Sequence, residues 1–306
     1  MESSLVSIIV LTYNKYDNLR YNLESIMIQD YPDIEIIISD DGSENFDINN
    51  IKAIVKDVNY RNLSVRILHN EKNVGTIKNY MHAYSVSSGK YVFELAQDDC
   101  FYESNSIAKI VNFIEKNDYK FVAAKRIGIK SETVLPEEED ICLLDGSIDK
   151  IIERLFFSNF ISGACFYFTR EAYEEMGGYD DNLRLVEDYS FILKLVLNNN
   201  KIGFLDSITI KYGESGVSSN NYIGQPAVVK DSIYTIEKYV VPNMHLVRNK
   251  KRRRFIQCKL LLLKGNICKM KLLEAIFLYF DIILILVFYL GIKKKSLTYL
   301  YHHILV

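Results

Sequence analysis

Short apolar runs alternate with amphipathic stretches over residues 1–130, and this alternation limits the fold more than any other feature of the sequence. Four runs rich in Val, Ile and Tyr occupy residues 6–11, 34–39, 65–68 and 91–95. They are continuously apolar, which is typical of strands buried on both faces of a parallel sheet. The stretches between them have helical spacing, and Asp17 and Asp47 are candidate N-caps of the first two helices. Repeated strand–helix units predict an α/β fold with a doubly wound sheet.

Polar and acidic side chains follow three of the predicted strands. In open α/β sheets, ligands bind outside the carboxyl ends of the strands, so these residues are candidates for a binding site. They are Thr12-Tyr13-Asn14, Asp40-Asp41-Gly42-Ser43 and Gln97-Asp98-Asp99. Crowded carboxylates raise one another's pKa unless a cation or hydrogen-bond donors neutralise them. Asp-Asp-Gly-Ser alone is also a good turn sequence, but two Asp pairs at equivalent strand ends favour a site.

A third acidic pair, Glu187-Asp188, lies at the start of an amphipathic helix that carries Phe191, Leu195 and Val196. Acidic residues in the first turn of a helix are favoured by the helix dipole, so simple capping is one interpretation of this pair. A catalytic role is the other, and the sequence pattern alone leaves both open.

The composition excludes several classes of protein. Of the 306 residues, 49% are hydrophobic and 25% are charged, which is ordinary for a globular protein and excludes disorder. The five Cys residues contain no C-x-x-C pair, so neither a disulfide framework nor a structural zinc site is indicated. The first residues lack the basic start of a signal peptide, so we expect a cytoplasmic protein.

Charge is distributed unevenly along the chain. Residues 226–306 hold 15 Lys or Arg and four Asp or Glu, a net charge of +11, and residues 1–225 carry a net charge of −13. We therefore expect two parts: a domain over residues 1–225 and a basic, hydrophobic helical region over residues 226–306. The length also agrees with about two domains of ~150 residues each.

The C-terminal region suggests contact with a membrane. A basic run at 250–254 precedes apolar residues, and 272–292 is long enough to span a bilayer, which needs ~20 residues. However, Asp281 near its middle disfavours a span. We expect helices that lie on the inner surface of the cytoplasmic membrane, with Lys and Arg meeting anionic lipid. A helical subdomain packed on the body and an interface between two copies in a homo-oligomer are alternatives. The apolar density and the lack of a recognised motif argue against nucleic-acid binding.

The ordered set of motifs resembles the inverting glycosyltransferases of family 2. Its pieces are Val6–Asn14, Asp40-Asp41-Gly42-Ser43, Asn73-Val74-Gly75 with Asn79, Gly89-Lys90-Tyr91 before Gln97-Asp98-Asp99, and Gly177-Gly178-Tyr179-Asp180 before Glu187-Asp188. The resemblance covers about residues 4–218. It implies the GT-A fold, a Rossmann-like mixed sheet that binds a nucleotide sugar and is flanked by helices.

The resemblance also implies how a nucleotide sugar is held. Leu11, Thr12, Tyr13 and Asn14 would contact the base and ribose. Asp41 would accept a hydrogen bond from the N–H of a uracil-type base, because a carboxylate only accepts. A UDP-sugar is therefore the favoured donor.

The family's Asp-x-Asp motif corresponds to Gln97-Asp98-Asp99. By resemblance, Asp98 faces the ribose or the sugar, and Asp99 binds Mg²⁺ or Mn²⁺ that bridges the diphosphate. Lys78 stands where many relatives have Arg, so the charge is kept but the planar fork for a bidentate phosphate contact is lost. The segment 211–216 lacks the His that some relatives supply as a further metal ligand.

Asp188 corresponds to the family's general base. It would take the proton of an acceptor hydroxyl that attacks the anomeric carbon from the side opposite the diphosphate, which inverts the configuration. Glu187 would orient the acceptor. The resemblance implies a glycan acceptor, with bacterial capsule, O-antigen or similar surface polysaccharide synthesis as the setting, and the tail suggests a lipid-linked acceptor.

Two other functions remain as alternatives. A sugar nucleotidyltransferase should carry a Gly-rich phosphate loop after the first strand, and residues 12–15 offer none. A non-catalytic membrane scaffold derived from a glycosyltransferase should have lost its acids, whereas Asp41, Asp99 and Asp188 are all present.

Overall fold

The computed structural model describes residues 3–144, 146–214 and 225–268. The chain forms two compact units. The first comprises Met1–Gly146 with Phe160–Asn220, and the second comprises Ser147–Asn159 with Asn221–Val306.

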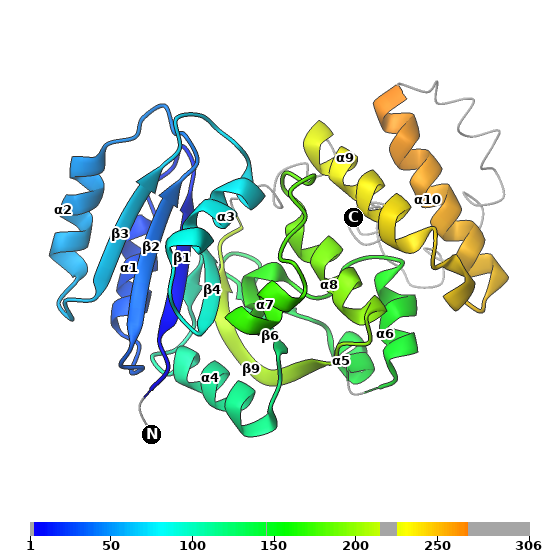
Figure 1. The fold of residues 1–306 in the computed structure, drawn as a ribbon, viewed down its shortest axis with the longest axis horizontal. Helices are drawn as coiled ribbons and strands as arrows, with labels where there is room; N and C mark the ends of the chain where they lie inside the picture. Colours follow the sequence, from blue (N-terminus) through cyan, green and yellow to red (C-terminus); the bar gives the residue numbers. More distant parts are fainter. Residues whose placement is uncertain (1–2, 145, 215–224, 269–306) are drawn as a thin grey trace. The chain divides into compact units, whose positions relative to one another are not determined.

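The first unit is built on a mixed sheet, whose described strands are arranged in the order β3-β2-β1-β4-β8-β6-β9-β5, with β7 paired to β6 (Figure 1). The strands β1 to β4 are parallel, β8 is antiparallel to its neighbours β4 and β6, and β9 is parallel to β6. Their bounds are β1 Val6–Thr12, β2 Ile34–Asp40, β3 Ser64–His69, β4 Tyr91–Ala96, β5 Cys100–Phe101, β6 Phe121–Gly128, β7 Val134–Leu135, β8 Phe166–Thr169 and β9 Ile202–Tyr212. The predicted α/β class with a mixed sheet is confirmed.

The central strands are buried on both faces, as their continuous apolar sequences predict. Every residue of β2 is buried, and in β1 all but Leu11 are buried. The register of β1 is in step with both neighbours, from Val6 opposite Ile34 and Tyr91 onward. Because the strands are parallel and in step, their carboxyl ends meet at one edge of the sheet.

Helices cover both faces of this sheet. The apolar residues of α1 (Leu19–Met27), α2 (Ile48–Val58) and α4 (Ser106–Asn117) join one core cluster with alternate residues of the central strands, such as Ile8 and Ile36. Helix α3 (Thr76–Val86) packs on the opposite face, where Asn79 exchanges hydrogen bonds with Ser39. The unit's remaining described helices are α5 (Glu138–Leu144), α7 (Arg170–Glu175) and α8 (Glu187–Leu197).

One predicted helix cap is confirmed and one is wrong. The Asp47 carboxylate accepts hydrogen bonds from the backbone N–H groups of Asn49 and Asn50 at the start of α2. Asp17 does not cap α1, because the chain becomes helical only at Leu19 and Asn18 occupies the N-cap position without a side-chain hydrogen bond.

The second unit is helical in its described part. It contains α6 (Ile148–Leu155), α9 (Pro226–Thr235), a π-helical turn (Ile236–Val240), a short 3-10 turn (Met244–Leu246) and α10 (Lys250–Cys268). Arg252 pairs with Glu153 at 3.0 Å, and the buried Lys259 donates to the Phe157 carbonyl at 2.7 Å. The basic run at 250–254 forms the start of α10. No helix in the described ranges is sufficiently long and apolar to cross a bilayer, and residues 272–292 lie outside those ranges.

Candidate functional site

The polar motifs that follow the parallel strands come together at one rim of the first unit. The N–H of Asp41 donates to the Thr12 carbonyl at 3.0 Å, which ties the end of β2 to the end of β1. The N–H of Gln97 donates to the Leu11 carbonyl at 3.1 Å, which ties the end of β4 to the same strand. The three strand-end motifs predicted from the sequence therefore lie side by side.

Asp40 holds the turn after β2 in shape. Its carboxylate accepts hydrogen bonds from the Ser43 N–H and hydroxyl, the Tyr16 and Thr12 hydroxyls, and a ring nitrogen of His69, at 2.5–3.2 Å. Burial by itself raises the pKa of Asp40, but these donors outweigh burial and hold the pKa below its ordinary value. Asp40 is thus a structural anion with its partners inside the protein.

Asp41 anchors the loop that precedes α3. One carboxylate oxygen accepts from the Val74 N–H at 2.8 Å, and the other accepts from the Gly75 N–H at 2.9 Å. The residue is only 4% exposed. These bonds fix the carboxylate beside the first turn of α3, where Lys78 is exposed. The Asn70 side-chain amide also donates to Asp41, at 3.3 Å, so the predicted bond from Asp41 to a base would use acceptor capacity that these three bonds leave over.

The residues after β1 differ in what they offer a ligand. Thr12 is buried and gives its hydroxyl to Asp40, and Leu11 is partly buried. Tyr13 is 48% exposed, so its ring is accessible for stacking. Asn14 is exposed as well, and its N–H donates to the Ser43 hydroxyl at 2.7 Å.

Asp98 and Asp99 follow β4 at the same rim. Asp99 is only 2% exposed and accepts the Gly213 N–H at 2.7 Å, whereas Asp98 is partly exposed. A side chain at Gly213 would place its Cβ 2.3 Å from the Asp98 carbonyl, so only glycine permits the end of β9 to approach so closely. Burial, and next the nearby charge of Asp98, raises the pKa of Asp99 well above its ordinary value.

The chemistry of Asp98 and Asp99 fits a divalent cation. Adjacent carboxylates present hard oxygen ligands, and a cation would favour the ionised form of Asp99 that burial otherwise disfavours. Within residues 3–144, 146–214 and 225–268, no group of three or more His, Cys, Asp or Glu side chains is arranged to hold a metal. Substrate phosphate oxygens and water are the usual further ligands of Mg²⁺ in such sites.

Asp188 lies in the first turn of α8, as predicted. Its carboxylate accepts the Gly163 N–H at 3.2 Å and the Tyr189 N–H at 2.6 Å. Burial raises its pKa, although these hydrogen bonds and the positive charge of Arg126 oppose the rise. Gly163 belongs to a 3-10 turn (Gly163–Cys165) before β8, and a Cβ there would lie 3.0 Å from that of Asp188. The neighbouring Glu187 is partly buried in the same turn of α8.

Two charged residues that we did not predict from the sequence connect these acids. Glu94 in β4 interacts electrostatically with both Asp99 and Asp188, and burial together with the charge of Asp188 raises the pKa of Glu94 to about 8. Arg126 in β6 likewise favours the ionised forms of Asp99 and Asp188. The available signal was the presence of charged side chains in strand sequences that are otherwise apolar, one in β4 and two adjacent ones in β6. Asp99 and Asp188, 89 positions apart, therefore share one electrostatic environment.

A loop contact fixes another part of this rim. Arg184, four residues before Asp188, donates to the Asn73 side chain and, at 3.4 Å, to the Val74 carbonyl. The segment that leads into α8 is thus held against the loop that Asp41 anchors. Tyr179, from the predicted Gly-Gly-Tyr-Asp motif, instead packs in an aromatic cluster, with its ring centroid 5.0 Å from that of Tyr80.

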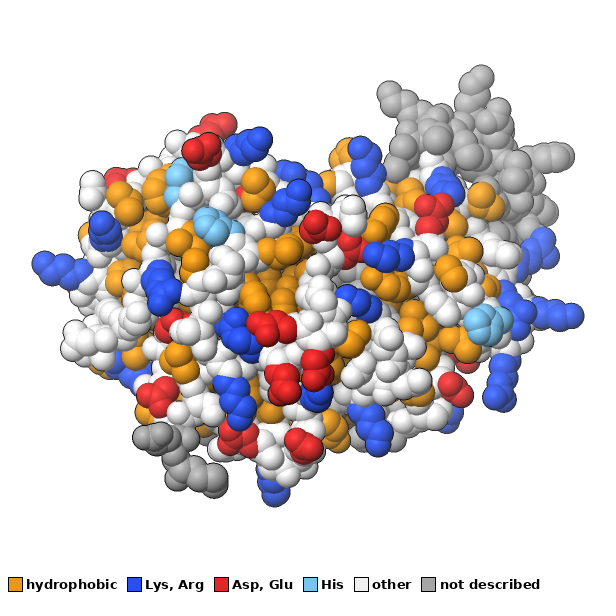
Figure 2. Space-filling view, viewed as in Figure 1, with side chains coloured by type: hydrophobic (Ala, Val, Ile, Leu, Met, Phe, Trp, Pro, Cys, Tyr) orange, Lys and Arg blue, Asp and Glu red, His pale blue; other side chains and the backbone are white. Residues whose placement is uncertain are grey.

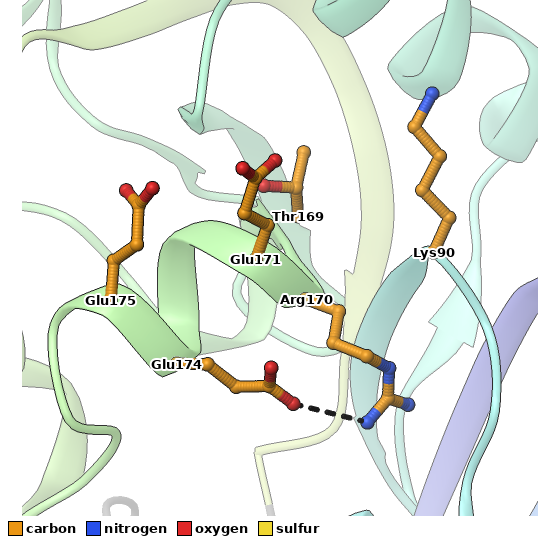
Figure 3. A pocket seen from close by; sticks show the side chains of 6 residues that line it. All are labelled: Lys90, Thr169, Arg170, Glu171, Glu174 and Glu175. Carbon is orange, nitrogen blue, oxygen red and sulfur yellow. Dashed lines mark ion pairs between the residues drawn. The ribbon is translucent and has the colours of Figure 1, made fainter.

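A surface pocket lies at the opposite edge of the sheet (Figure 3). Its volume is about 540 Å³ and its lining residues are Lys90, Thr169, Arg170, Glu171, Glu174 and Glu175. Thr169 pairs with Tyr91 at the amino end of β4, whereas Asp98 and Asp99 follow the carboxyl end. The Arg170–Glu174 ion pair at 3.8 Å crosses part of this pocket, which is separate from the acidic rim.

Comparisons of sequence agree with one another. The family model described as Glycosyl transferase family 2 matches residues 7–177, more than half of the chain. An uncharacterized glycosyltransferase of Rickettsia felis is 26% identical over 274 residues, covering 82% of this chain and 42% of that protein. A PGL/p-HBAD biosynthesis glycosyltransferase of Mycobacterium bovis is 25% identical over 227 residues, covering 73% and 82%. The chain spans 42%, 34% and 33% of the first three curated relatives it matches.

Solved structures share the fold. S. aureus TarS 1-349 in complex with UDP-GlcNAc aligns with a TM-score of 0.61 and 22% identity, covering 88% of this chain and 77% of that chain. The mannosyltransferase PcManGT from Pyrobaculum calidifontis, in complex with GDP-Man and Mn²⁺, aligns with a TM-score of 0.62 and 16% identity, covering 93% and 81%. At these identities the likeness is one of fold.

Proposed function

Because the chain belongs to glycosyl transferase family 2, we propose that it transfers a sugar, with inversion, from a nucleoside diphosphate donor to a hydroxyl of a glycan acceptor. The observation that carries this proposal is the shared electrostatic environment of Asp99 and Asp188 at a rim that also holds Asp41. The nucleotide sugars bound to TarS and PcManGT support this class of donor. A UDP-sugar remains the favoured donor.

The donor would lie along the ends of β1, β2 and β4. The exposed Tyr13 ring and Asn14 would contact the base and ribose together with the backbone of Leu11 and Thr12, and Asp41 would accept a base N–H. The exposed Lys78 would approach the diphosphate as a point charge.

Asp99, with Asp98 beside it, would hold Mg²⁺ or Mn²⁺, and the Mn²⁺ in PcManGT supports this choice of ion. When bound, such an ion offsets the negative charge that develops on the departing diphosphate. The chain itself contributes the Gly213 N–H, which orients the Asp99 carboxylate for this role.

Asp188 would take the acceptor's proton. As the hydroxyl oxygen bonds to the anomeric carbon, the bond from that carbon to the diphosphate oxygen breaks, and the hydroxyl proton passes to the Asp188 carboxylate. The raised pKa of Asp188 makes it a better proton acceptor than an ordinary Asp. The Gly163 N–H would keep the carboxylate oriented while Glu187 positions the acceptor.

The proposed setting is the cytoplasmic surface of the membrane, with a lipid-linked acceptor of bacterial surface polysaccharide synthesis. Arg248, Lys250, Arg252 and Arg254 are all exposed around the start of α10. Figure 2 shows blue side chains gathered at the right-hand margin, where the gold start of α10 lies in Figure 1. Exposed Lys and Arg attract anionic lipid by about 1 kcal/mol each.

The test is a donor screen. The full chain is incubated with UDP-, GDP- and dTDP-sugars, with and without Mn²⁺, and release of the nucleoside diphosphate is measured. We expect release from one donor class and tighter binding of its nucleoside diphosphate when Mn²⁺ is present. Absence of both transfer and donor hydrolysis across the screen, together with absence of nucleotide binding, would overturn the proposal.

A further inference from the structure

We propose that Arg126 is a binding residue for a phosphoryl oxyanion, placed between the donor and acceptor sides of the rim. This inference rests on the proposed function and adds to it a contact that the sequence motifs do not contain.

The strand register places Arg126 at the rim. Phe168 of β8 pairs with Val92 of β4 on one side and with Phe121 of β6 on the other. Both outer strands are antiparallel to β8, so they run in the same direction. Five residues beyond those pairs lie Gln97 and Arg126, so the arginine is level with the first residue after β4.

The guanidinium of Arg126 has an incomplete set of partners. Its carbon lies 3.8 Å from the centroid of the Tyr212 ring, and a cation stacked in this way keeps its N–H groups at the edge available. Its Nε is buried and has no hydrogen-bond partner. No carboxylate in the described part of the chain forms an ion pair with Arg126. A buried donor without an acceptor costs free energy, and a bound oxyanion would remove that cost.

The neighbouring acids show which side of the substrates Arg126 would meet. Its charge favours the ionised forms of Asp99, on the diphosphate side, and Asp188, on the side of the attacking hydroxyl. A planar guanidinium suits two oxygens of a phosphoryl group. Lys78 lacks this planar fork, so Arg126 supplies from β6 the bidentate contact that Lys78 cannot make.

A phosphoryl group at this position has two sources. One is the β-phosphate of the donor, where negative charge increases as the bond to the sugar breaks. The other is a phosphate carried by the acceptor. Both sources would present phosphoryl oxygens to the guanidinium, and binding experiments distinguish the donor phosphate from the acceptor phosphate.

The experiment measures binding calorimetrically to the full chain with Mn²⁺ present. The variants are Arg126→Gln, Arg126→Lys and the matched control Lys125→Gln, which removes the adjacent cation that pairs with Asp206. UDP, uridine and glycerol 3-phosphate are the probes, the last titrated into UDP-saturated protein.

If the donor supplies the phosphate, Arg126→Gln weakens UDP binding about tenfold or more and leaves uridine binding unchanged, since a charge-assisted bidentate contact is lost. If the acceptor supplies it, UDP binding is kept and glycerol 3-phosphate binding is lost. Arg126→Lys keeps the charge, so it should lose less affinity for the same probe. It replaces the Gln variant in the test if that variant does not fold. Lys125→Gln behaves as wild type in both cases.

Unchanged binding of both UDP and glycerol 3-phosphate in folded Arg126 variants would overturn the inference while leaving the proposed function intact. A wild-type chain that binds none of UDP, GDP and dTDP would instead overturn the proposed function. The two failures are therefore distinguishable.

Discussion

Two adjacent carboxylates, Asp40 and Asp41, have different tasks although both are buried. Asp40 is enclosed by hydroxyl, ring and backbone donors that hold its own turn in shape. Asp41 reaches across to the loop before α3, where both of its oxygens accept backbone N–H groups. The residue identity is the same, and the neighbours that each side chain meets decide what it does.

At the same scale, Asp188→Asn should lower turnover by roughly 10²–10⁴-fold, because the amide cannot take the acceptor's proton. Binding of the nucleoside diphosphate should be unchanged, since the proposed partner of Asp188 is the acceptor hydroxyl. Nucleoside diphosphate release and calorimetric binding measure the two effects. The control is Asp181→Asn, an exposed Asp in the same connecting segment. Equal turnover of Asp188→Asn and wild type would remove Asp188 from its proposed role.

A second residue-scale prediction concerns Glu94, whose pKa in the folded chain is about 8 against ~4.3 for an ordinary Glu. A raised pKa means that the folded state binds the extra proton, so its contribution to stability is present below pH ~4.3 and is lost as the pH rises through about 8. Glu94→Gln, which stays neutral, should therefore gain stability relative to wild type across this range. Thermal unfolding at pH 5 and pH 8.5 without metal measures it, with each kcal/mol worth roughly 2–4 °C. A difference in Tm that does not grow with pH would contradict the prediction.

The elements place these residues through register and connection. Strand β8 begins only at Phe166, because residues 163–165 before it form a 3-10 turn. That turn supplies the N–H that orients Asp188. Likewise β6 reads as a strand with two charges near its end, and only its register with β8 shows that Arg126 reaches the rim.

At the scale of the element, Asp47→Ala should destabilise the first unit by about 0.5–2 kcal/mol, since α2 loses the acceptor for two N–H groups. Turnover measured well below the unfolding temperature should be unchanged, because the Asp47 carboxylate bonds to the backbone of α2 and not to a residue of the proposed site. Urea unfolding followed by circular dichroism gives the free energy. Asp17→Ala is the matched control, and it should change stability little because Asp17 caps no helix.

At the scale of the whole molecule, the chain divides into two compact units, and the second combines a short segment from the middle of the chain, Ser147–Asn159, with the C-terminal part. The net charge of +11 over residues 226–306 lies in that later part. The exposed bases at the start of α10 support the proposed contact with anionic membrane surfaces. The predicted division into 1–225 and 226–306 and the cytoplasmic, membrane-bound location both stay predictions.

Replacing Arg248, Lys250 and Arg254 together by Ser should weaken binding to vesicles that contain phosphatidylglycerol, by about 1 kcal/mol for each residue. Arg252 is left in place because it pairs with Glu153. Co-sedimentation at 0.1 M salt measures the effect, and turnover on a water-soluble acceptor should be kept. The control replaces three exposed lysines of the first unit, Lys52, Lys56 and Lys116. Equal vesicle binding by the two triple variants would count against membrane contact through α10.

The sequence by itself determined the α/β class, the four parallel strands, the Asp47 cap and the acidic motifs at the strand ends, because these depend on local periodicity and on residues near one another in the chain. The contacts between distant parts of the chain depend on which strands pair and on the register of each pair. Asp41 meets the loop at Val74, Gly163 orients Asp188, and Glu94 and Arg126 connect Asp99 with Asp188. Only the tertiary structure decided these contacts, since register and strand order bring together side chains whose separation along the chain contains no signal of their proximity.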